Sequence, residues 1–484
     1  MSTEIIHVKT LILGAGFGGL GMGAQLARHG DRDFVILEQA QALGGVWRDN
    51  TYPGAACDTE AHLYCYSFFP HLRVSRMYAD RDELLGYQRA LAQAHDLEAH
   101  IVFNTRILSA RWSQADKLWG FETSSGQRYS AQFFIPAWGQ LNHPLIPAFK
   151  GVDRFKGASF HSAQWRDDVD LRGKRVASIG NAASAVQYIP EIAPLVAHLT
   201  VFQRSANWLM PRVQTVFTAA ELDAYEADPS LFDASRQHLH AFRESGFART
   251  LHGTDAKEEG MQIALAHLEA QIADPVLRDK LTPRYEFGCK RILKSDDFYP
   301  ALARANVSVE TAGIAEITET GIRTGDGQDI ELDVIIYGTG FASQAFHGDL
   351  QVTGQGGLTL SDAWSEGAAA YVGLSVPHFP NMFLMYGPNT NLNHNSIISM
   401  MEIQQRYILS ALGDLPQGTA ASVKPEVFAA FNDRLQKDMA LSSFSADCSS
   451  WYKNAAGKVI NNWSGTVDAY RAAARWTPQD YLIA

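Results

Sequence analysis

The sequence predicts an α/β protein that contains two Rossmann-like dinucleotide-binding domains and a helical insertion. A glycine-rich turn between an apolar strand and a helix occurs near the N-terminus, and a similar pattern recurs within 175–204. A stretch rich in Ala, Leu, Glu and His with helical spacing follows at 215–285. At 484 residues the chain is too long for one hydrophobic core, so two or three domains are expected.

The first nucleotide unit begins with an apolar run at 8–13, which is typical of a buried strand. Gly14, Gly16 and Gly19 follow at the G-x-G-x-x-G spacing. The first glycine makes the tight turn, the second lets the backbone approach a pyrophosphate, and the third lets helix and strand pack closely. A second strand ends on Glu38, whose carboxylate would accept a hydrogen bond from a ribose hydroxyl. The unit predicts a dinucleotide site, and a purely structural turn is the alternative.

The stretch "ALGGVWRDNTYPGAACD" at 42–58 is a second segment in which the backbone can approach a ligand closely. It contains the pair Gly44 and Gly45, and Trp47 follows as an aromatic plate. Such a segment suits a large planar cofactor such as flavin better than a nicotinamide. A turn with a buried tryptophan is the alternative.

The second unit, "RVASIGNAASAVQYIPEI" at 175–192, departs from the usual glycine pattern. Its strand runs into Gly180 and a helix is expected to begin near Ala185, with Ser184 beside the turn. Ala182 stands where the middle glycine is usual, so we expect its methyl group to loosen or shift a bound nucleotide. A vestigial site is the alternative.

The two units carry opposite charges at equivalent positions. Glu38 lies 24 residues after Gly14, and Arg204 lies 24 residues after Gly180. A carboxylate at this position pairs with a free ribose 2′-hydroxyl, whereas an arginine pairs with a 2′-phosphate. The first site is therefore expected to bind FAD and the second NADPH.

The chain is expected to cross between domains twice. Residues 133–147 end a strand and leave through a glycine and two prolines, which marks the first crossover. The apolar strand within "ELDVIIYGTGFASQAF" at 331–346 is interpreted as the return to the first domain. The predicted boundaries are 1–140 and 331–484 for the FAD-binding domain, 141–215 and 286–330 for the NADP-binding domain, and 216–285 for the helical insertion.

Charge and composition argue against nucleic-acid and membrane partners. The net charge of −11 disfavours nucleic acid, and no apolar stretch is long enough to span a membrane. Four cysteines (Cys57, Cys65, Cys289 and Cys448) form no C-x-x-C pair and have no metal-ligand spacing, so free thiols are expected. With no signal-peptide layout at the N-terminus, these features predict a soluble cytoplasmic protein.

The segment "FKGASFHSAQW" carries a specific resemblance. It fits F-x-G-x-x-x-H-x-x-x-W and resembles the fingerprint of the class B flavin monooxygenases, specifically the type I Baeyer–Villiger monooxygenases. The segments "GCKRIL", "GPNTNLNHNSII", "CSSWY" and "NNWSG" also resemble family segments in the family order. Arg166, after the fingerprint, and Ala182 depart from the family pattern, and both concern the handling of NADP. The fingerprint residues are Phe155, Gly157, His161 and Trp165.

The resemblance implies an enzyme that uses FAD, NADPH and molecular oxygen to insert an oxygen atom next to a ketone carbonyl through a C4a-peroxyflavin. It implies that Arg291 is the catalytic arginine and that Asp58 orients it. Lys290 would lie by the NADP 2′-phosphate together with Arg204. It further implies that Trp463 contacts the nicotinamide nucleotide and that His161 links domain motion to catalysis.

Other functions remain open at this stage. The same flavin chemistry would serve a monooxygenase that oxygenates sulfides or amines, and an uncoupled NADPH oxidase is a further alternative. A disulfide reductase is disfavoured because Cys57 and Cys65 are eight residues apart. His238, His240 and His252 fit no metal site well, so no metal is expected. The sequence does not define which ketone is the substrate.

Overall fold

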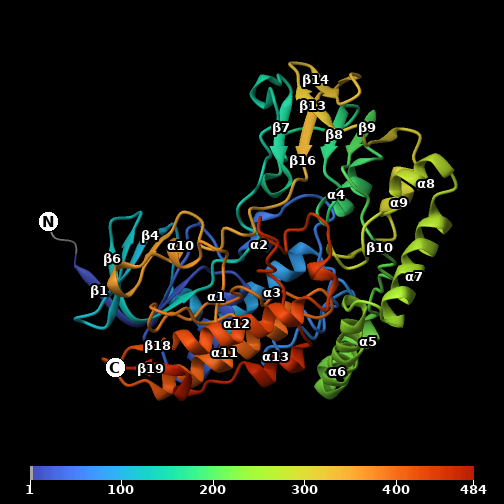
Figure 1. Ribbon diagram of the computed structural model, residues 1–484. Helices are drawn as coiled ribbons and strands as arrows, with labels where there is room; N and C mark the ends of the chain where they lie inside the picture. Colours follow the sequence, from blue (N-terminus) through green and yellow to red (C-terminus); the bar gives the residue numbers. More distant parts are fainter. Residues whose placement is uncertain (1–3) are drawn as a thin grey trace.

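The first sheet has seven strands in the order β17-β4-β5-β6-β1-β2-β3. Figure 1 labels three of them, β1, β4 and β6, near the N-terminus. The computed structural model describes residues 4–484. β1 runs parallel to β2 and β6, whereas β4 to β6 are joined by antiparallel pairs. The glycine-rich turn therefore lies at the carboxyl edge of the parallel part, where such sheets bind ligands. The strands are β1 (Ile5–Leu13), β2 (Phe34–Leu37), β3 (Ile101–Val102), β4 (Ile107–Ser113), β5 (Leu118–Thr123), β6 (Arg128–Pro136) and β17 (Gln351–Thr353).

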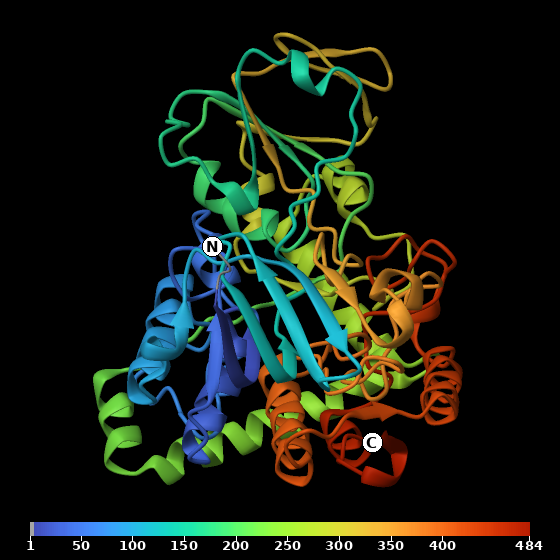
Figure 2. The ribbon, with the colours of Figure 1, turned by 90° about the vertical axis from the view of Figure 1, so that its left-hand side faces the viewer.

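Helices from both ends of the chain share the largest hydrophobic core with this sheet. α1 connects β1 to β2 and packs against α3 and α11. Figure 2 shows the strands in blue and cyan, with the C-terminal helices in orange and red below them. The FAD-type unit is thus completed by residues more than 350 positions apart in the sequence. The elements are α1 (Phe17–Arg28), α2 (Val46–Asp49), α3 (Arg81–Ala94), α10 (Leu360–Ala363), α11 (Ile397–Asp414), α12 (Pro425–Met439), α13 (Val467–Ala473), β18 (Ala421–Val423) and β19 (Tyr481–Ile483).

The second sheet has five parallel strands in the order β12-β9-β8-β16-β7. Its central strands are buried on both faces, as expected for a parallel sheet. α4 and α9 pack together on one face. The predicted α/β class with two Rossmann-like units is confirmed. The elements are β7 (Ala158–His161), β8 (Arg175–Ile179), α4 (Ala185–Ile192), β9 (His198–Phe202), α9 (Phe298–Leu302), β12 (Val307–Glu310) and β16 (Val334–Tyr337).

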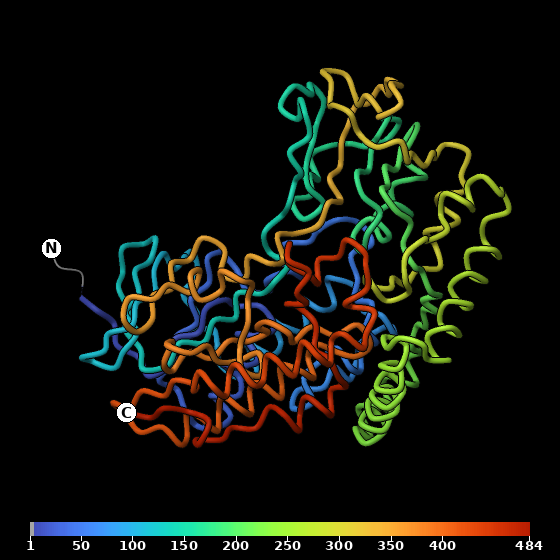
Figure 3. Tube along the Cα trace, viewed as in Figure 1, coloured from blue at the N-terminus to red at the C-terminus, as the bar shows by residue number. Residues whose placement is uncertain are grey.

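One predicted crossover is wrong. β16 was expected to start the return to the first sheet, but it pairs with β8 and β7 in the second sheet. A run of four buried apolar residues fits a central parallel strand in either sheet, so the sequence pattern does not distinguish them. The chain returns to the first sheet only after residue 337 (Figure 3).

Four helices lie between two short strands that pair with each other. β10 (Leu209–Met210) and β11 (Leu293–Lys294) are parallel and bring the chain before and after the helices side by side. The helices are α5 (Ala219–Ala227), α6 (Pro229–Ser245), α7 (Asp255–Gln271) and α8 (Pro275–Leu281). A separate antiparallel sheet at the far end of the second unit contains β13 (Ile314–Ile317), β14 (Gly321–Thr324) and β15 (Asp329–Glu331). Over residues 4–484, no helix has the length and apolar character needed to cross a membrane.

Candidate active site

The first glycine turn has no room for side chains. Gly14 adopts a φ of +98°, and a Cβ atom at Gly19 would lie 1.8 Å from the carbonyl oxygen of Gly14. Gly16 lies against Gly45, where a Cβ atom would be 3.1 Å from the Cα atom of Gly16. The N-cap residue of α1 is Gly16, which has no side chain to cap the first turn of the helix. These features fit a bound pyrophosphate.

Glu38 lies immediately after β2 and is buried. Its Oε2 accepts a hydrogen bond from the backbone N–H of Ala15 at 2.8 Å, and its Oε1 accepts one from Ala40 at 2.9 Å. Arg48 Nη1 lies 3.2 Å from Oε1. Two carboxylate oxygens offer about four acceptor positions, so a ribose hydroxyl is compatible with these bonds.

Trp47 lies on the short helix α2, next to the Gly44–Gly45 turn. Its Nε1 donates to the hydroxyl of Tyr64 at 3.3 Å, and the two rings meet edge to face. Gly44 donates to the carbonyl of Ala15 at 2.8 Å, which fixes this segment to the first glycine turn. The aromatic plate and the dinucleotide turn are therefore adjacent.

The second glycine turn has the same architecture with one difference. Gly180 has a φ of +107°, and a Cβ atom there would lie 2.3 Å from the carbonyl oxygen of Gly338. α4 begins at Ala185, as the sequence predicts, and the Ser184 side chain makes no cap bond. Ala182 is exposed on the turn, where a nucleotide would approach.

Two cations gather beside this second turn. Arg204 is exposed just after β9, and Lys290 is half-buried, donating to Ser205 Oγ at 2.8 Å. Burial lowers the pKa of Lys290, and the positive charge of nearby Arg204 lowers it further. Within residues 4–484, no ion pair with a carboxylate is recorded for either side chain. Unpaired neighbouring cations at this position fit a 2′-phosphate.

Arg291 and Asp58, 233 residues apart, form a bidentate ion pair. Arg291 Nη2 lies 2.6 Å from Asp58 Oδ1 and 2.7 Å from Oδ2, and Nε donates to Oδ2 at 3.2 Å. Burial alone would raise the pKa of Asp58, but Arg291, with Lys294 and Arg243, lowers it to about 2. In return, Asp58 raises the pKa of Arg291 above its ordinary value. Both groups are therefore charged at neutral pH.

The loop that carries Asp58 is fixed to the second nucleotide unit through Gln187 on α4. Tyr52 donates to Gln187 Oε1 at 2.9 Å, and Gln187 Nε2 donates to the carbonyl of Ala56 at 2.8 Å. A Cβ atom at Gly54 would lie 2.8 Å from the carbonyl of Gln187, so the segments are in close contact. The ion pair therefore lies where the two nucleotide units meet.

A small cavity of about 40 Å³ adjoins the ion pair. Arg291 and Asp58 line it together with Arg243, Lys294 and Asn393. The sequence analysis did not single out the last three. Lys294 follows Arg291 by three residues. Asn393 lies inside the family-like segment "GPNTNLNHNSII", so the resemblance could have indicated it as a site residue.

The fingerprint residues lie around β7 and the return crossover. His161 is buried; its Nε2 donates to the carbonyl of Gly340 at 2.9 Å, and its Nδ1 accepts from the N–H of Ala163 at 3.1 Å. Burial lowers the pKa of His161, so the ring is neutral at pH 7. It joins the end of β7 to the return crossover, whereas its link to domain motion stays a prediction.

The other fingerprint residues make packing contacts. A Cβ atom at Gly157 would lie 2.4 Å from the carbonyl of Asp333. Trp165 meets Phe160 edge to face and packs against Tyr188 of α4. Phe155 is partly buried in the core on the other face of the sheet. Arg166, one of the two departures, pairs with Asp168 at the surface.

Within residues 4–484, Trp463 makes no hydrogen bond or ring contact with Lys290 or Arg291. Its Nε1 donates to the carbonyl of Thr466 at 3.0 Å, and its ring meets Tyr470 edge to face. The nicotinamide contact therefore stays a prediction.

His240, in the helical part, lies near two carboxylates. His240, Glu244 and Asp468 bring ligand atoms within 4.8 Å of one another. Glu244 already accepts from Asn395 and from the backbone N–H groups of Val467 and Asp468. Its oxygens are thus used to cap α13.

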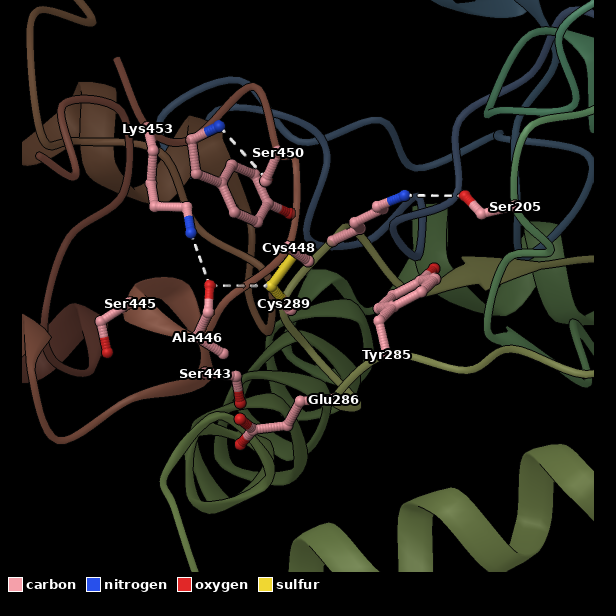
Figure 4. Close-up of a disulfide and its surroundings, with 12 residues drawn as sticks. Ser205, Tyr285, Glu286, Cys289, Ser443, Ser445, Ala446, Cys448, Ser450 and Lys453 are labelled. Atoms are coloured by element: carbon pink, nitrogen blue, oxygen red, sulfur yellow. Dashed lines mark hydrogen bonds between the residues drawn. A yellow bond between two sulfur atoms is a disulfide. The ribbon is translucent and has the colours of Figure 1, made fainter. Parts of the chain in front are cut away.

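The prediction of four free thiols is wrong for two of them. Cys289 and Cys448 form a disulfide (Figure 4), whereas Cys57 and Cys65 are free and buried. Cys289 and Cys448 are 159 positions apart and give no local spacing signal, so the sequence could not reveal the pair. The bond joins the residue before Lys290 to the C-terminal loop at 446–453.

Comparisons with known proteins agree on one family. The model of the flavin-binding monooxygenase-like family matches residues 7–222. A Baeyer–Villiger monooxygenase of Pseudomonas aeruginosa is 38% identical over 97% of this chain and 90% of its own length. One from Streptomyces coelicolor is 39% identical over 97% and 91%. A cyclohexanone 1,2-monooxygenase of an Acinetobacter species is 33% identical over 81% and 80%.

Solved structures show the same similarity. An oxidised steroid monooxygenase bound to NADP superposes with a TM-score of 0.87 at 29% identity, over 99% of each chain. A closed form of cyclohexanone monooxygenase superposes with a TM-score of 0.86 at 27% identity, over 97% of each chain.

Proposed function

The chain belongs to the Baeyer–Villiger monooxygenases among the flavin-binding monooxygenases, and from that premise we propose how its own residues serve this chemistry. The protein uses FAD, NADPH and molecular oxygen to insert one oxygen atom beside a ketone carbonyl, which yields an ester or lactone. The observation that carries the proposal is the Arg291–Asp58 ion pair at the junction of the two nucleotide units. A cytoplasmic location, where NADPH is available, is part of the proposal.

Arg291 acts on the negative charge of the reaction. Bound FAD, reduced by NADPH, supplies the electrons that activate oxygen. Oxygen addition to a carbonyl places negative charge on the carbonyl oxygen, and a fixed cation at that point lowers the energy of the charged state. A guanidinium suits this role because it stays protonated when it is partly buried. Its fork of N–H groups also gives it directional donors.

Asp58 positions the arginine. Its two oxygens hold Nη2 and Nε, which leaves the Nη1 side of the guanidinium free of this carboxylate. Because the pKa of Asp58 is lowered to about 2, the carboxylate stays charged and holds the arginine over the working pH range.

The two cofactors are distinguished by charge at the strand ends. Glu38 favours a dinucleotide with a free ribose hydroxyl, whereas Arg204 and Lys290 favour one with a 2′-phosphate. Gly14, Gly16 and Gly19 would hold the FAD pyrophosphate, and Gly180 and Ser184 flank the position of the NADPH pyrophosphate.

The test measures ester formation from a ketone with NADPH and oxygen, in parallel with sulfoxide formation from a sulfide. We expect flavin in the purified protein and ester product from the wild type. Arg291→Ala should abolish ester formation while NADPH still reduces the flavin. Arg323→Ala is the matched control, because Arg323 pairs with Asp329 at the surface of the distant small sheet. Sulfoxide without ester would favour the heteroatom oxygenase, and NADPH consumption with peroxide release alone would favour the oxidase.

A further inference from the structure

The cavity beside Arg291 is polar on nearly every side. Its walls include Asp58, Thr59, Arg243, Arg291, Lys294 and Asn393. Its volume of about 40 Å³ has room for about three water-sized groups, which suits a carboxylate better than a ring. Such a cavity would receive one polar end of a substrate.

The three cations that line the cavity differ in how closely a carboxylate holds them. Arg291 is paired with Asp58, and Arg243 forms a second bidentate pair with Glu60 at 2.6 and 2.8 Å. Lys294 is the third cation. Its Nζ lies 3.7 Å from Glu60 Oε1, which is beyond a hydrogen bond. Of these three cations, Lys294 is therefore the one without a carboxylate at hydrogen-bond distance.

Lys294 also has unused donors. Its one recorded hydrogen bond goes to the hydroxyl of Tyr78, at 3.3 Å, whereas an ammonium group has three N–H donors. Burial and then Arg243 lower the pKa of Lys294 to about 8, against the opposing effect of Glu60, Asp58 and Cys57. An anion in the cavity would supply the missing partner.

Asn393 provides an independent observation. Its Oδ1 accepts a hydrogen bond from the hydroxyl of Tyr452 at 2.6 Å, which leaves Nδ2 facing away from that bond. Among the described residues, Nδ2 is buried and has no partner. A buried donor without a partner costs about 1–3 kcal/mol in general, and buried donors are normally bonded to a protein group, a water molecule or a ligand.

We propose that Lys294 and Asn393 together bind a carboxylate carried by the substrate, so that the enzyme prefers keto acids to neutral ketones. This inference rests on the proposed function and names its substrate class. One carboxylate oxygen accepts from Lys294 and the other from Asn393 Nδ2. Lys294 and Asn393 determine specificity, and Arg291 acts on the carbonyl.

The test compares methyl-ketone carboxylic acids with their methyl esters, over a series in which the number of methylene groups between the carbonyl and carboxyl groups varies. The ester keeps the size and removes the charge. In the wild type, kcat/KM for the preferred acid should exceed that for its ester by tenfold or more. In Lys294→Met this ratio should fall to about one, mainly through the KM of the acid, with the ester nearly unaffected.

Matched variants separate binding from folding. Lys294→Arg should retain much of the preference for the acid, and Asn393→Leu should lose part of it. Lys437→Met, at an exposed position on α12, is the control for loss of a lysine. Flavin content and melting temperature, measured for each variant, show whether it is folded.

A second readout does not depend on turnover. Calorimetry with a saturated carboxylic acid of matching length should detect binding to the wild type and a tenfold or greater loss in Lys294→Met. If neither acid nor ester is oxidised but this binding difference is found, the inference stands and the proposed function fails. Equal use of acid and ester throughout the series, or a preference for the acid that survives in Lys294→Met, would overturn the inference.

Discussion

Removing the Cys289–Cys448 disulfide should lower the melting temperature by a few degrees. The bond closes a loop of 159 residues, and the chain-entropy relation for a loop of this length gives about 5 kcal/mol at 25 °C. Unfolding entropy of about 2.1 cal/mol/K per residue amounts to about 1 kcal/mol/K for 484 residues. Reduction should therefore lower the melting temperature by about 5 °C if the chain unfolds as one unit.

The assay is calorimetric scanning with and without a phosphine reductant, combined with thiol titration in denaturant. Two thiols should react before reduction and four after it, because Cys57 and Cys65 are free. Cys448→Ser should melt like the reduced wild type and should not respond to reductant, which separates this bond from other effects of the reagent. Four reactive thiols before reduction, or a reductant effect that persists in Cys448→Ser, would refute the reasoning.

Three further predictions follow from the geometry. Arg204→Ala should raise the KM for NADPH by about tenfold or more and leave the KM for NADH within about twofold. The reason is that a hydrogen bond from a charged side chain to the 2′-phosphate is worth about 1.5–3 kcal/mol. Equal effects on both nucleotides would contradict the placement of Arg204. Gly19→Ala should lower the free energy of unfolding by about 3 kcal/mol and cause loss of flavin, because the new Cβ atom would lie 1.8 Å from a carbonyl oxygen. Gly86→Ala is the control, because a Cβ atom there meets nothing within 4 Å. The ratio of flavin to protein, measured for both variants, tests this. Since the pKa of Lys294 is about 8, its charge is present below that pH and lost above it, so the preference for acids over esters should decline as the pH rises through about 8.

The elements that the sequence predicts well have local signals. The strand, glycine turn and helix of each nucleotide unit lie within about 30 residues, and their spacing restricts the backbone directly. Glu38 and Arg204 were placed by counting from the turns, and the structure has both of them just after the second strand of their unit. β16 was assigned to the wrong sheet because the apolar pattern of a buried strand does not indicate which sheet the strand joins.

The residues that sequence reasoning missed are brought in by long-range contacts. Glu60 and Arg243 are 183 residues apart, and no spacing rule connects them. Their identity as a buried pair depends on α6 packing over the loop after Asp58. The disulfide was missed for the same reason, and the assumption of a reducing compartment argued against it.

The cavity beside Arg291 brings the residue proposed for catalysis close to the residue proposed for substrate choice. Arg291 and Lys294 lie three residues apart around β11, and both line one cavity. Asp58 neutralises the first, while Glu60 is already engaged by Arg243 and neutralises the second only at a distance. Under the proposed function, Arg291 is the cation that acts on the reacting carbonyl, and Lys294 is a second cation whose ammonium group has further N–H donors available. Exchanging Lys294 should change which ketone is chosen, whereas exchanging Arg291 should remove the reaction itself.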